Sequence, residues 1–464
     1  MFDLFGLFRK TKATPHKTAV KLGVEVLEDR TVPTLLGKQL FPLNNAWNQK
    51  IVSAPVAANS AAVMNHIVSV YGDGQLRADF GENNLAHAPL YGIPYNVVHG
   101  NTTPKISVVL DNYKSESDPI PAPIPLNAVL EGDNRDGPVF GLDARGDSHL
   151  IVYDVDKNIA YEFFGASRPN ENADGKWHAK QQTVWNMNTN PTRPIGWTSA
   201  DAAGLSILAG LARPDEALPV SQGGQGVIKH AIRVTLQNDL ILNKFVYPAS
   251  HVANPGNTDA SILVPMGGRF RLKASVDLSQ MPPQSRILAQ AMKDYGLIVA
   301  DNGSNFFFSG ASDAVNANNK ITLTWENDDI QDDVVGIKSL KYSDFELVDL
   351  TPRITGFSVT HARAGMGFSI LGQNFSGSGG RLTVYFGNVR TTAILYVNDN
   401  RIVVFVPAGI TGKVTIRVQS GRTVTPFVAE NVQGTIFGYG ISELSSLSFF
   451  TIDTALPAFG HRGG

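Results

Sequence analysis

Residues 352–433 consist of short stretches in which apolar and polar residues alternate, and Gly, Asn or Pro interrupts these stretches about every 8–12 residues. Alternation places every second side chain on one face of a strand, and turn residues at this spacing separate the strands of an antiparallel sandwich. Gly372 and Asn374 tolerate a left-handed turn, and Pro407 ends the apolar stretch from Ile402 to Val406. The pattern predicts a small β-sandwich.

The same segment resembles an IPT/TIG domain, an immunoglobulin-like module. The resemblance is carried by Ile354-Thr-Gly-Phe357, Gly365, Gly367, Ile370-Leu-Gly372, Asn374-Phe375, Val384-Tyr-Phe-Gly387, Val406-Pro-Ala-Gly409 and Gly412. It implies a sandwich of the kind that stands beside catalytic or adhesive domains in exported bacterial proteins. Related modules of eukaryotic Rel-type factors bind DNA. Here the 8 cations of residues 353–433 are dispersed along the strands and an acidic domain precedes them, so we expect no nucleic-acid partner.

The N-terminal segment is basic and carries a short motif. Residues 1–34 contain 6 Lys/Arg and 4 Asp/Glu, without the apolar core and small-residue cleavage site of a standard secretory signal. Glu25, Leu27, Glu28, Arg30 and Pro33 resemble, in register, the LExLExRxxP motif of exported planctomycete proteins. This resemblance implies secretion or sorting to the cell surface; the alternative is a basic leader without a role. No apolar run approaches the roughly 18 residues of a membrane span.

We divide the chain into a leader at 1–37, a central domain at 38–350, the sandwich at 352–433 and a tail rich in Gly, Ser and Phe at 434–464. Strand patterns dominate the central part, which predicts a mainly β chain: a large β-rich domain with about three peripheral helices, followed by the sandwich. The strands are expected at 106–110, 149–154, 159–164, 228–236, 269–274, 297–300 and 306–309, and the helices at 59–71, 199–211 and 282–295.

The central domain is also similar to a recurring type of secreted bacterial protein. The similarity lies in Phe41 to Asn48, Gly196 to Asp201, Met266 to Ala274 and Val299 to Gly303. Because that type has no established activity, the similarity implies one continuous exported domain and nothing about its chemistry.

Composition excludes several classes of site. The chain has no cysteine, which rules out disulfide scaffolds, thiolate nucleophiles and Cys-based metal sites. The net charge of −2 conceals an uneven distribution, since residues 35–352 carry 24 Lys/Arg against 33 Asp/Glu and residues 353–464 carry 9 against 4. GxSxG, HExxH and phosphate-binding glycine motifs are absent from the sequence. Function must therefore be sought in individual side chains.

Residues 150–164, LIVYDVDKNIAYEFF, predict a hairpin with Asp156 and Lys157 at its tip. In this register Ile151 pairs with Glu162, and His149 shares the face of Glu162 as a diagonal neighbour roughly 5–8 Å away. A His–carboxylate pair can perform acid–base chemistry. The alternatives are a surface ion pair, a buried hydrogen-bonded histidine, or a longer loop that puts the two residues on opposite faces.

Two aspartates and a second histidine complete the catalytic candidates. Asp201 belongs to the first turn of the helix expected at 199–211. Asp301 follows the apolar strand 297–300, where both a strand-end catalytic carboxylate and a plain Asp-Asn-Gly turn would fit. His230 points to an apolar face by alternation, as a hydrogen-bonded core histidine or as a buried base.

Cations and tryptophans are the candidates for substrate binding. Alternation projects three cations of one strand from a single face, spaced by about 7 Å, where they either line a groove for carboxylated or sulfated sugars or form a solvated surface. Tryptophans either stack on sugar rings or fill the core. The candidates are Arg269, Arg271 and Lys273 on that strand, Arg233 on another, and Trp177, Trp185 and Trp197.

Carboxylates are dense just after Trp325. Glu326, Asp328, Asp329 and Asp332 are candidate calcium ligands, which would suit an exported protein, and a solvated acidic loop is the alternative. The run Asp154-x-Asp156-x-Asn158 begins like a calcium loop but lacks its later Gly and Glu, which favours turn chemistry. We expect no required cofactor, with Ca²⁺ as the open alternative.

These features favour a secreted or cell-surface protein whose central domain binds or degrades an extracellular polysaccharide, with the IPT/TIG module as an accessory. If the domain is catalytic, we expect a glycoside hydrolase that uses two of Glu162, Asp201 and Asp301, with His149 or His230 assisting. A lyase with His230 as base and Arg271 as uronate partner is a weaker alternative. The competing class is a non-catalytic adhesin or surface-structure protein. The oligomeric state is not predicted.

Overall fold

The computed structural model describes residues 34–81, 92–133, 147–253, 256–312, 314–315, 321–375, 382–391, 393–423, 436–442 and 448–453. Strands make up 34% and helices 17% of the structure, which confirms the expected mainly β chain with a C-terminal sandwich. The export motif ends at Pro33 and lies outside the described residues. None of the helices in the described part is long and apolar enough to cross a membrane.

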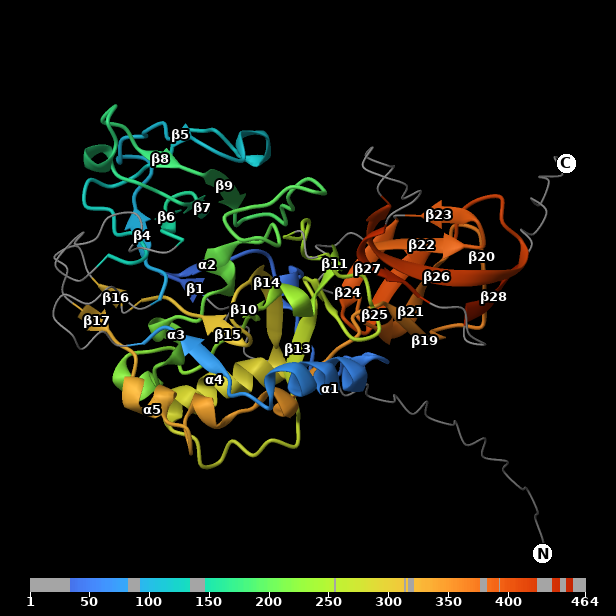
Figure 1. Ribbon diagram of the computed structural model, residues 1–464. Helices are drawn as coiled ribbons and strands as arrows, with labels where there is room; N and C mark the ends of the chain where they lie inside the picture. Colours follow the sequence, from blue (N-terminus) through green and yellow to red (C-terminus); the bar gives the residue numbers. More distant parts are fainter. Residues whose placement is uncertain are drawn as a thin grey trace, which may run out of the picture. The chain divides into compact units, whose positions relative to one another are not determined.

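A six-stranded mixed sheet lies at the centre of the residues before 350, in the order β18-β13-β14-β10-β15-β3 (Figure 1). β10 and β14 pair in parallel, and most of their side chains are buried, as is usual for strands covered on both faces. Helices α1, α4 and α5 lie together on one side of this sheet (Figure 1). The bounds are β3 Arg77–Asp79, β10 Ile232–Leu236, β13 Arg269–Leu272, β14 Leu297–Asn302, β15 Phe307–Ser309, β18 Phe345–Leu347, α1 Ser60–Tyr71, α4 Pro283–Asp294 and α5 Asn327–Gln331.

A second sheet has four strands in the order β4-β6-β7-β9, namely Tyr95–Val98, Leu150–Asp154, Ile159–Phe164 and Gln181–Asn186. β6 and β7 form the expected hairpin, with Ile151 opposite Glu162. Ile151 and Tyr153 pack into the main core of the domain, whereas Leu150 and Val152 pack into a smaller core on the other face. Because both faces are covered, β6 and β7 are apolar over most of their length.

Short elements connect these sheets. They are β1 Thr34–Leu35, β2 Lys38–Gln39, β5 Val109–Leu110, β8 His178–Ala179, α2 Ile207–Gly210, α3 Pro214–Ala217, β11 Ile241–Phe245, β12 Val264–Met266, β16 Ala314–Val315 and β17 Ile321–Leu323. The strand expected at 106–110 is reduced to β5, and the strand expected at 228–236 begins only at Ile232, so that His230 precedes it.

Two of the three expected helices are confirmed, α1 and α4, and the third is wrong over most of its length. Of residues 199–211 only α2 is helical, with Ser206 as its N-cap. Gly204 has a φ of +73°, and the Ser199 hydroxyl donates to the carbonyl of Leu205 at 2.5 Å. These backbone and side-chain bonds compete with helix formation and hold a loop in its place.

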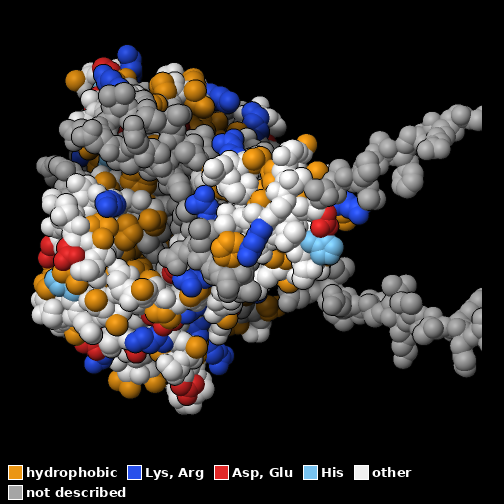
Figure 2. Space-filling view, turned by 90° about the vertical axis from the view of Figure 1, so that its right-hand side faces the viewer, with side chains coloured by type: hydrophobic (Ala, Val, Ile, Leu, Met, Phe, Trp, Pro, Cys, Tyr) orange, Lys and Arg blue, Asp and Glu red, His pale blue; other side chains and the backbone are white. Residues whose placement is uncertain are grey.

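The C-terminal sandwich has a core of its own, which includes Ile370, Phe386, Val404 and Ile416. Two of its strands come from the segment expected as a separate tail, since β28 pairs with β20 and β26 and β27 pairs with β26. The strands are β19 Arg353–Phe357, β20 His361–Arg363, β21 Gly367–Gln373, β22 Leu382–Phe386, β23 Val389–Thr391, β24 Ile394–Asn398, β25 Arg401–Phe405, β26 Gly412–Thr423, β27 Ile436–Ile441 and β28 Phe449–Asp453. Figure 2 shows one face of the molecule, on which Lys and Arg side chains are scattered among hydrophobic, acidic and uncharged ones.

Candidate functional site

A cleft of about 550 Å³ opens in the central domain. Its volume is in the range of small-molecule sites. Residues from several parts of the fold line it: Tyr113, Asp147, Phe164, Thr198, Ser199, Ala200, Ala202, His251, Val252, Ala253, Asp301 and Asn302. Phe164 and Asn302 end β7 and β14, and the loops at 198–202 and 251–253 complete the wall. One of the predicted catalytic residues, Asp301, lines this cleft, and a second, Asp201, is buried next to it.

Arg233 holds the two aspartates together from beneath. On β10, its Nε and Nη2 donate to the two carboxylate oxygens of Asp201 at 3.0 and 2.6 Å, and Nη2 lies 3.5 Å from Oδ2 of Asp301. Its Nη1 donates to the Ser309 hydroxyl at 2.5 Å. Arg233 and Asp201 are buried, whereas the Asp301 side chain is 17% exposed. Arg233, expected as a substrate-binding cation, is therefore a structural partner of the aspartates.

The environment of Asp301 favours its protonated form. Burial raises its pKa well above the ordinary value, the neighbouring Asp201 carboxylate raises it further, and Arg233 only partly opposes both. Asp301 and Asp201 are in side-chain hydrogen-bond contact, and Arg233 donates to both carboxylate oxygens of Asp201. The result is a neutral carboxylic acid at the edge of a cleft, an arrangement suited to general acid catalysis.

His149 lies behind the wall of the cleft and is paired with Glu131, not with Glu162. Its Nδ1 is 2.7 Å from Oε2 of Glu131 and its Nε2 is 3.1 Å from the carbonyl oxygen of Ala200. Both partners only accept, so both ring nitrogens carry protons and the ring is an imidazolium. Burial by itself lowers the pKa of His149, but Glu131 outweighs burial and raises it to about 9. His149 is therefore a structural cation and not an acid–base partner of Glu162.

Glu162 is fully buried and holds the start of α2. Its carboxylate accepts from the backbone N–H groups of Ile207 and Leu208 at 2.9 and 3.0 Å, from the Ser206 hydroxyl at 2.7 Å and from the Trp185 indole at 3.0 Å. Carboxylates at a helix N-terminus satisfy N–H groups that the helix leaves unpaired. Burial raises the pKa of Glu162, and the four donors oppose that effect. Glu162 positions α2 and does not line the cleft.

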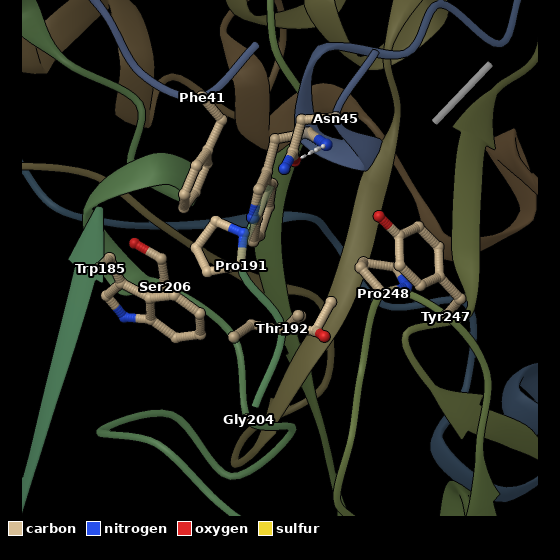
Figure 3. Close-up of a pocket in the computed structure, with 11 residues that line it drawn as sticks. Phe41, Asn45, Trp185, Pro191, Thr192, Gly204, Ser206, Tyr247 and Pro248 are labelled. Atoms are coloured by element: carbon tan, nitrogen blue, oxygen red, sulfur yellow. Dashed lines mark hydrogen bonds between the residues drawn. The ribbon is translucent and has the colours of Figure 1, made fainter. Parts of the chain in front are cut away.

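The partners of Glu162 border a second, narrow pocket (Figure 3). Phe41, Trp185 and Tyr247 supply its aromatic walls, and the Phe41 and Trp185 rings meet edge to face at 6.3 Å. Asn45 at its rim accepts from the Trp47 backbone N–H. Nearly all of these side chains are buried, which identifies them as core packing with a small gap.

Two loops form the cleft wall and are bonded to one another. Ser250 donates its backbone N–H to the carbonyl of Ala203 and its hydroxyl to that of Trp197, and Gly196 donates to Ser250. A Cβ on Gly204 would lie 2.1 Å from the Ser250 hydroxyl. Only glycine combines this close approach with the positive φ found there. The contact places the loop that carries Asp201 against the segment that leads into His251.

The remaining predicted residues lie elsewhere. His230 Nε2 is 3.1 Å from Glu216, which also pairs with Arg213 in a buried network, so His230 is a core histidine. Arg269 donates to the carbonyls of Ala46 and Gln49. Arg271 pairs with Glu346 and with three backbone carbonyls of residues 51–54, and Lys273 donates to the carbonyl of Ser343. The expected cationic groove is thus a set of structural contacts.

The predicted tryptophans do not line the cleft. Trp177 and Trp185 are buried in the core, and Trp197 is partly exposed beneath the Arg193 guanidinium, 5.3 Å from its ring centre. The aromatic residues of the cleft are instead Tyr113 and Phe164.

The carboxylates at 326–332 serve local structure. Asp328 and Asp329 stand in the first turn of α5, Asp332 accepts from the backbone N–H groups of Val334 and Val335, and Glu326 is exposed. Across the described ranges, no three His, Asp or Glu side chains lie close enough to hold a metal ion. The geometry fits turn and helix-start chemistry.

The sequence interpretation missed three residues of the site. His251, Asp147 and Glu131 stand in irregular segments without a strand or helix pattern, and two of them line the cleft. The sequence feature that could have pointed to His251 is a histidine next to turn residues. Many surface loops share that feature. Only the folded chain brings them to Asp301.

Comparison with known proteins bears on the C-terminal part. Residues 352–435 match the model of the IPT/TIG domain family. The chain has a C-terminal IPT/TIG domain. No curated protein matches the chain.

Among solved structures, one similar chain is a candidate phosphatase from Bacteroides thetaiotaomicron, 20% identical over 22% of this chain and 18% of that one, with a TM-score of 0.16. Another is SGBP-B from a complex xyloglucan utilization locus in Bacteroides uniformis, 16% identical over 23% of this chain and 26% of that one, also with a TM-score of 0.16. The chain thus spans about a quarter or less of the solved chains that it matches, and likenesses of this extent carry no argument about its activity. The IPT/TIG domain remains the identified part.

Proposed function

We propose that the central domain hydrolyses glycosidic bonds of an extracellular polysaccharide, with Asp301 as the general acid. The observation that carries the proposal is the place of the Asp301 carboxyl at the edge of an open cleft, where burial and the contact with Asp201 raise its pKa well above the ordinary value. A glycoside hydrolase needs such an acid to protonate the departing oxygen.

Each group near the cleft has a role in this reaction. Asp301 gives its proton to the glycosidic oxygen while Arg233 remains paired with both oxygens of Asp201. Asp147 lines the same cleft as an exposed carboxylate, where it would stabilise the positive charge that develops on the sugar ring. Tyr113 and Phe164 offer apolar surfaces for the faces of sugar rings.

Asp201 does not activate the attacking water in this proposal. It is buried, in hydrogen-bond contact with Asp301, and both of its oxygens are bound by Arg233. Inverting glycosidases separate their two carboxyl groups by about 6.5–9.5 Å to make room for water. The lyase alternative loses its support, because His230 and Arg271 lie in structural contacts away from the cleft.

Export and an accessory role of the IPT/TIG domain complete the proposal. The motif at Glu25 to Pro33 supports secretion or surface sorting, and the absence of cysteine leaves stability to the large apolar cores. The IPT/TIG domain would act as a spacer or accessory module beside the catalytic domain.

The test is an array of extracellular polysaccharides, read for both binding and release of reducing ends. We expect Asp301→Asn to lower the rate of release by about 10²- to 10⁴-fold, the usual share of a general acid, while binding is retained. Asp328→Asn, which makes the same change at an exposed position of α5, is the matched control and should leave the rate unchanged. Full activity of Asp301→Asn would reject the assignment.

A non-catalytic adhesin is the competing function. It would show binding to the same array by the wild type, without any release of reducing ends. The IPT/TIG domain favours this class as much as the first, because such modules occur beside both.

A further inference from the structure

His251 lines the cleft together with Asp301 and Asp147. It comes directly after Ser250 in the sequence, and its backbone N–H donates to the carbonyl of Ala203 at 3.3 Å. The ring is partly exposed. The backbone bonds of Ser250 and of His251 itself therefore position this side chain in the wall.

One ring nitrogen of His251 is occupied and the other is not, within the described part of the chain. Nδ1 lies 2.7 Å from the carbonyl oxygen of Ala202. A carbonyl only accepts, so Nδ1 carries the proton in this contact. A neutral ring then has its lone pair on Nε2, for which the described residues provide no hydrogen-bonding partner.

Three other charged groups near the cleft are already engaged. His149 is an imidazolium with acceptors on both nitrogens. Asp201 is held by Arg233, and the Glu131 carboxylate binds His149. Asp147 also lines the cleft and is assigned to stabilise the charge on the sugar ring. His251, with a fixed tautomer and a lone pair that no described residue engages, is therefore the candidate base of the wall.

We propose that His251 is the general base that activates water in the reaction assigned to Asp301; this inference rests on that proposed function. Nε2 takes a proton from a water molecule as the water oxygen forms a bond to the anomeric carbon. The bond between that carbon and the glycosidic oxygen breaks, and the oxygen takes the proton of Asp301. The imidazolium then loses its proton to solvent, and Asp301 regains one. Direct attack by water inverts the configuration of the anomeric carbon.

The tautomer of His251 can be tested on the wild-type full-length protein without any substrate. Nitrogen-15 NMR of the histidine rings, assigned with His251→Gln, should show His251 with its proton on Nδ1 when the ring is neutral. Diethyl pyrocarbonate should modify His251 at Nε2, as mapped by mass spectrometry. A ring with its proton on Nε2, or one that resists modification while His66 on α1 reacts, would overturn the inference.

The catalytic role is tested on a polysaccharide that the array identifies. We expect His251→Ala to lower kcat by about 10²- to 10⁴-fold with a smaller change in KM, and added imidazole to restore part of the rate. His66→Ala, the control on α1, should leave both constants unchanged. The first sugar released should show the inverted anomer by proton NMR.

The outcomes separate the two proposals. Loss of activity in Asp301→Asn with full activity in His251→Ala rejects His251 as the base and leaves the Asp301 assignment standing. A retained anomer in the product also rejects His251, because water would not then attack the substrate directly. No release of reducing ends from any polysaccharide by the wild type rejects the proposed hydrolysis, and the base with it.

Discussion

His149 carries a positive charge because of two contacts that lie far from it in the sequence. Glu131 lies 18 residues before it and Ala200 51 residues after it. Without Glu131, burial would favour the neutral ring. A buried imidazolium paired with a carboxylate ties stability to pH.

We expect the free energy of unfolding to fall as the pH rises from about 6.5 to about 9. Below its ordinary pKa of 6.5, His149 is protonated in both the folded and the unfolded chain, and the ion pair contributes fully. Between that value and about 9 only the folded form keeps the proton, so the contribution is lost progressively. The loss is about 3 kcal/mol, because one pKa unit corresponds to about 1.4 kcal/mol.

Urea denaturation across this pH range provides the measurement, with His149→Gln as the comparison. The variant cannot gain or lose this proton, so its stability should change less with pH over the interval. Parallel curves for the wild type and the variant would show that the His149–Glu131 pair does not set this dependence.

At the scale of elements, the site depends on loops and not on the regular strands that carry them. The loop at 196–206 and the segment at 247–253 are joined by Ser250 and by the close approach at Gly204. Glu162 secures the end of the first loop through α2. Asp201 and His251 are thus positioned by the same set of contacts.

Gly204→Ala should therefore affect both stability and the site. The added Cβ would lie 2.1 Å from the Ser250 hydroxyl and 2.7 Å from the Trp197 carbonyl, at a φ of +73°. We expect a loss of more than about 2 kcal/mol, since the left-handed conformation alone costs about 1–2 kcal/mol. The proposed hydrolysis should weaken too, because Asp201 and His251 move.

Gly223→Ala is the matched control for this substitution. Its φ is +87°, but an added Cβ would meet nothing within 4 Å. It should show the backbone cost alone, of about 1–2 kcal/mol, and normal activity. Equal losses in the two variants by urea denaturation would mean that the contact with Ser250 does not matter.

At the scale of the whole molecule, the chain has separate apolar cores. The core of the IPT/TIG domain shares no residue with the cores of the central domain. In the core of the IPT/TIG domain, the rings of Phe368 and Phe450 are stacked, with their centres 4.4 Å apart. In the core of the central domain, the ring centre of Phe270 lies 5.0 Å from that of Phe306.

Calorimetry of the full chain should therefore show two unfolding transitions. Phe368→Ala should lower the melting temperature of the IPT/TIG transition alone, and Phe270→Ala that of the central domain alone, each with a loss of about 3–5 kcal/mol. A single transition that both variants shift equally would show that the two parts unfold as one cooperative unit.

Local patterns were sufficient for much of the fold. The hairpin register follows from the turn at Asp156 and Lys157, α1 and α4 from caps and periodicity, and the IPT/TIG sandwich from alternation with turn residues. These features depend on neighbours in the sequence, so the sequence carries their signal. The same patterns wrongly predicted a helix over residues 199–206. There, bonds to Ser250 compete with helix formation.

The sequence by itself determined the residue types of the site, a mainly β chain with an IPT/TIG domain, and the exclusion of cysteine chemistry. Only the tertiary structure decided which polar groups meet: Asp201 and Asp301 with Arg233, His149 with Glu131, and Glu162 with α2. It also places His251 at the cleft, where Nε2 has no hydrogen-bonding partner among the described residues. The physical reason is that a charge or a proton depends on burial and on partners within a few ångströms, and those partners come from distant parts of the chain.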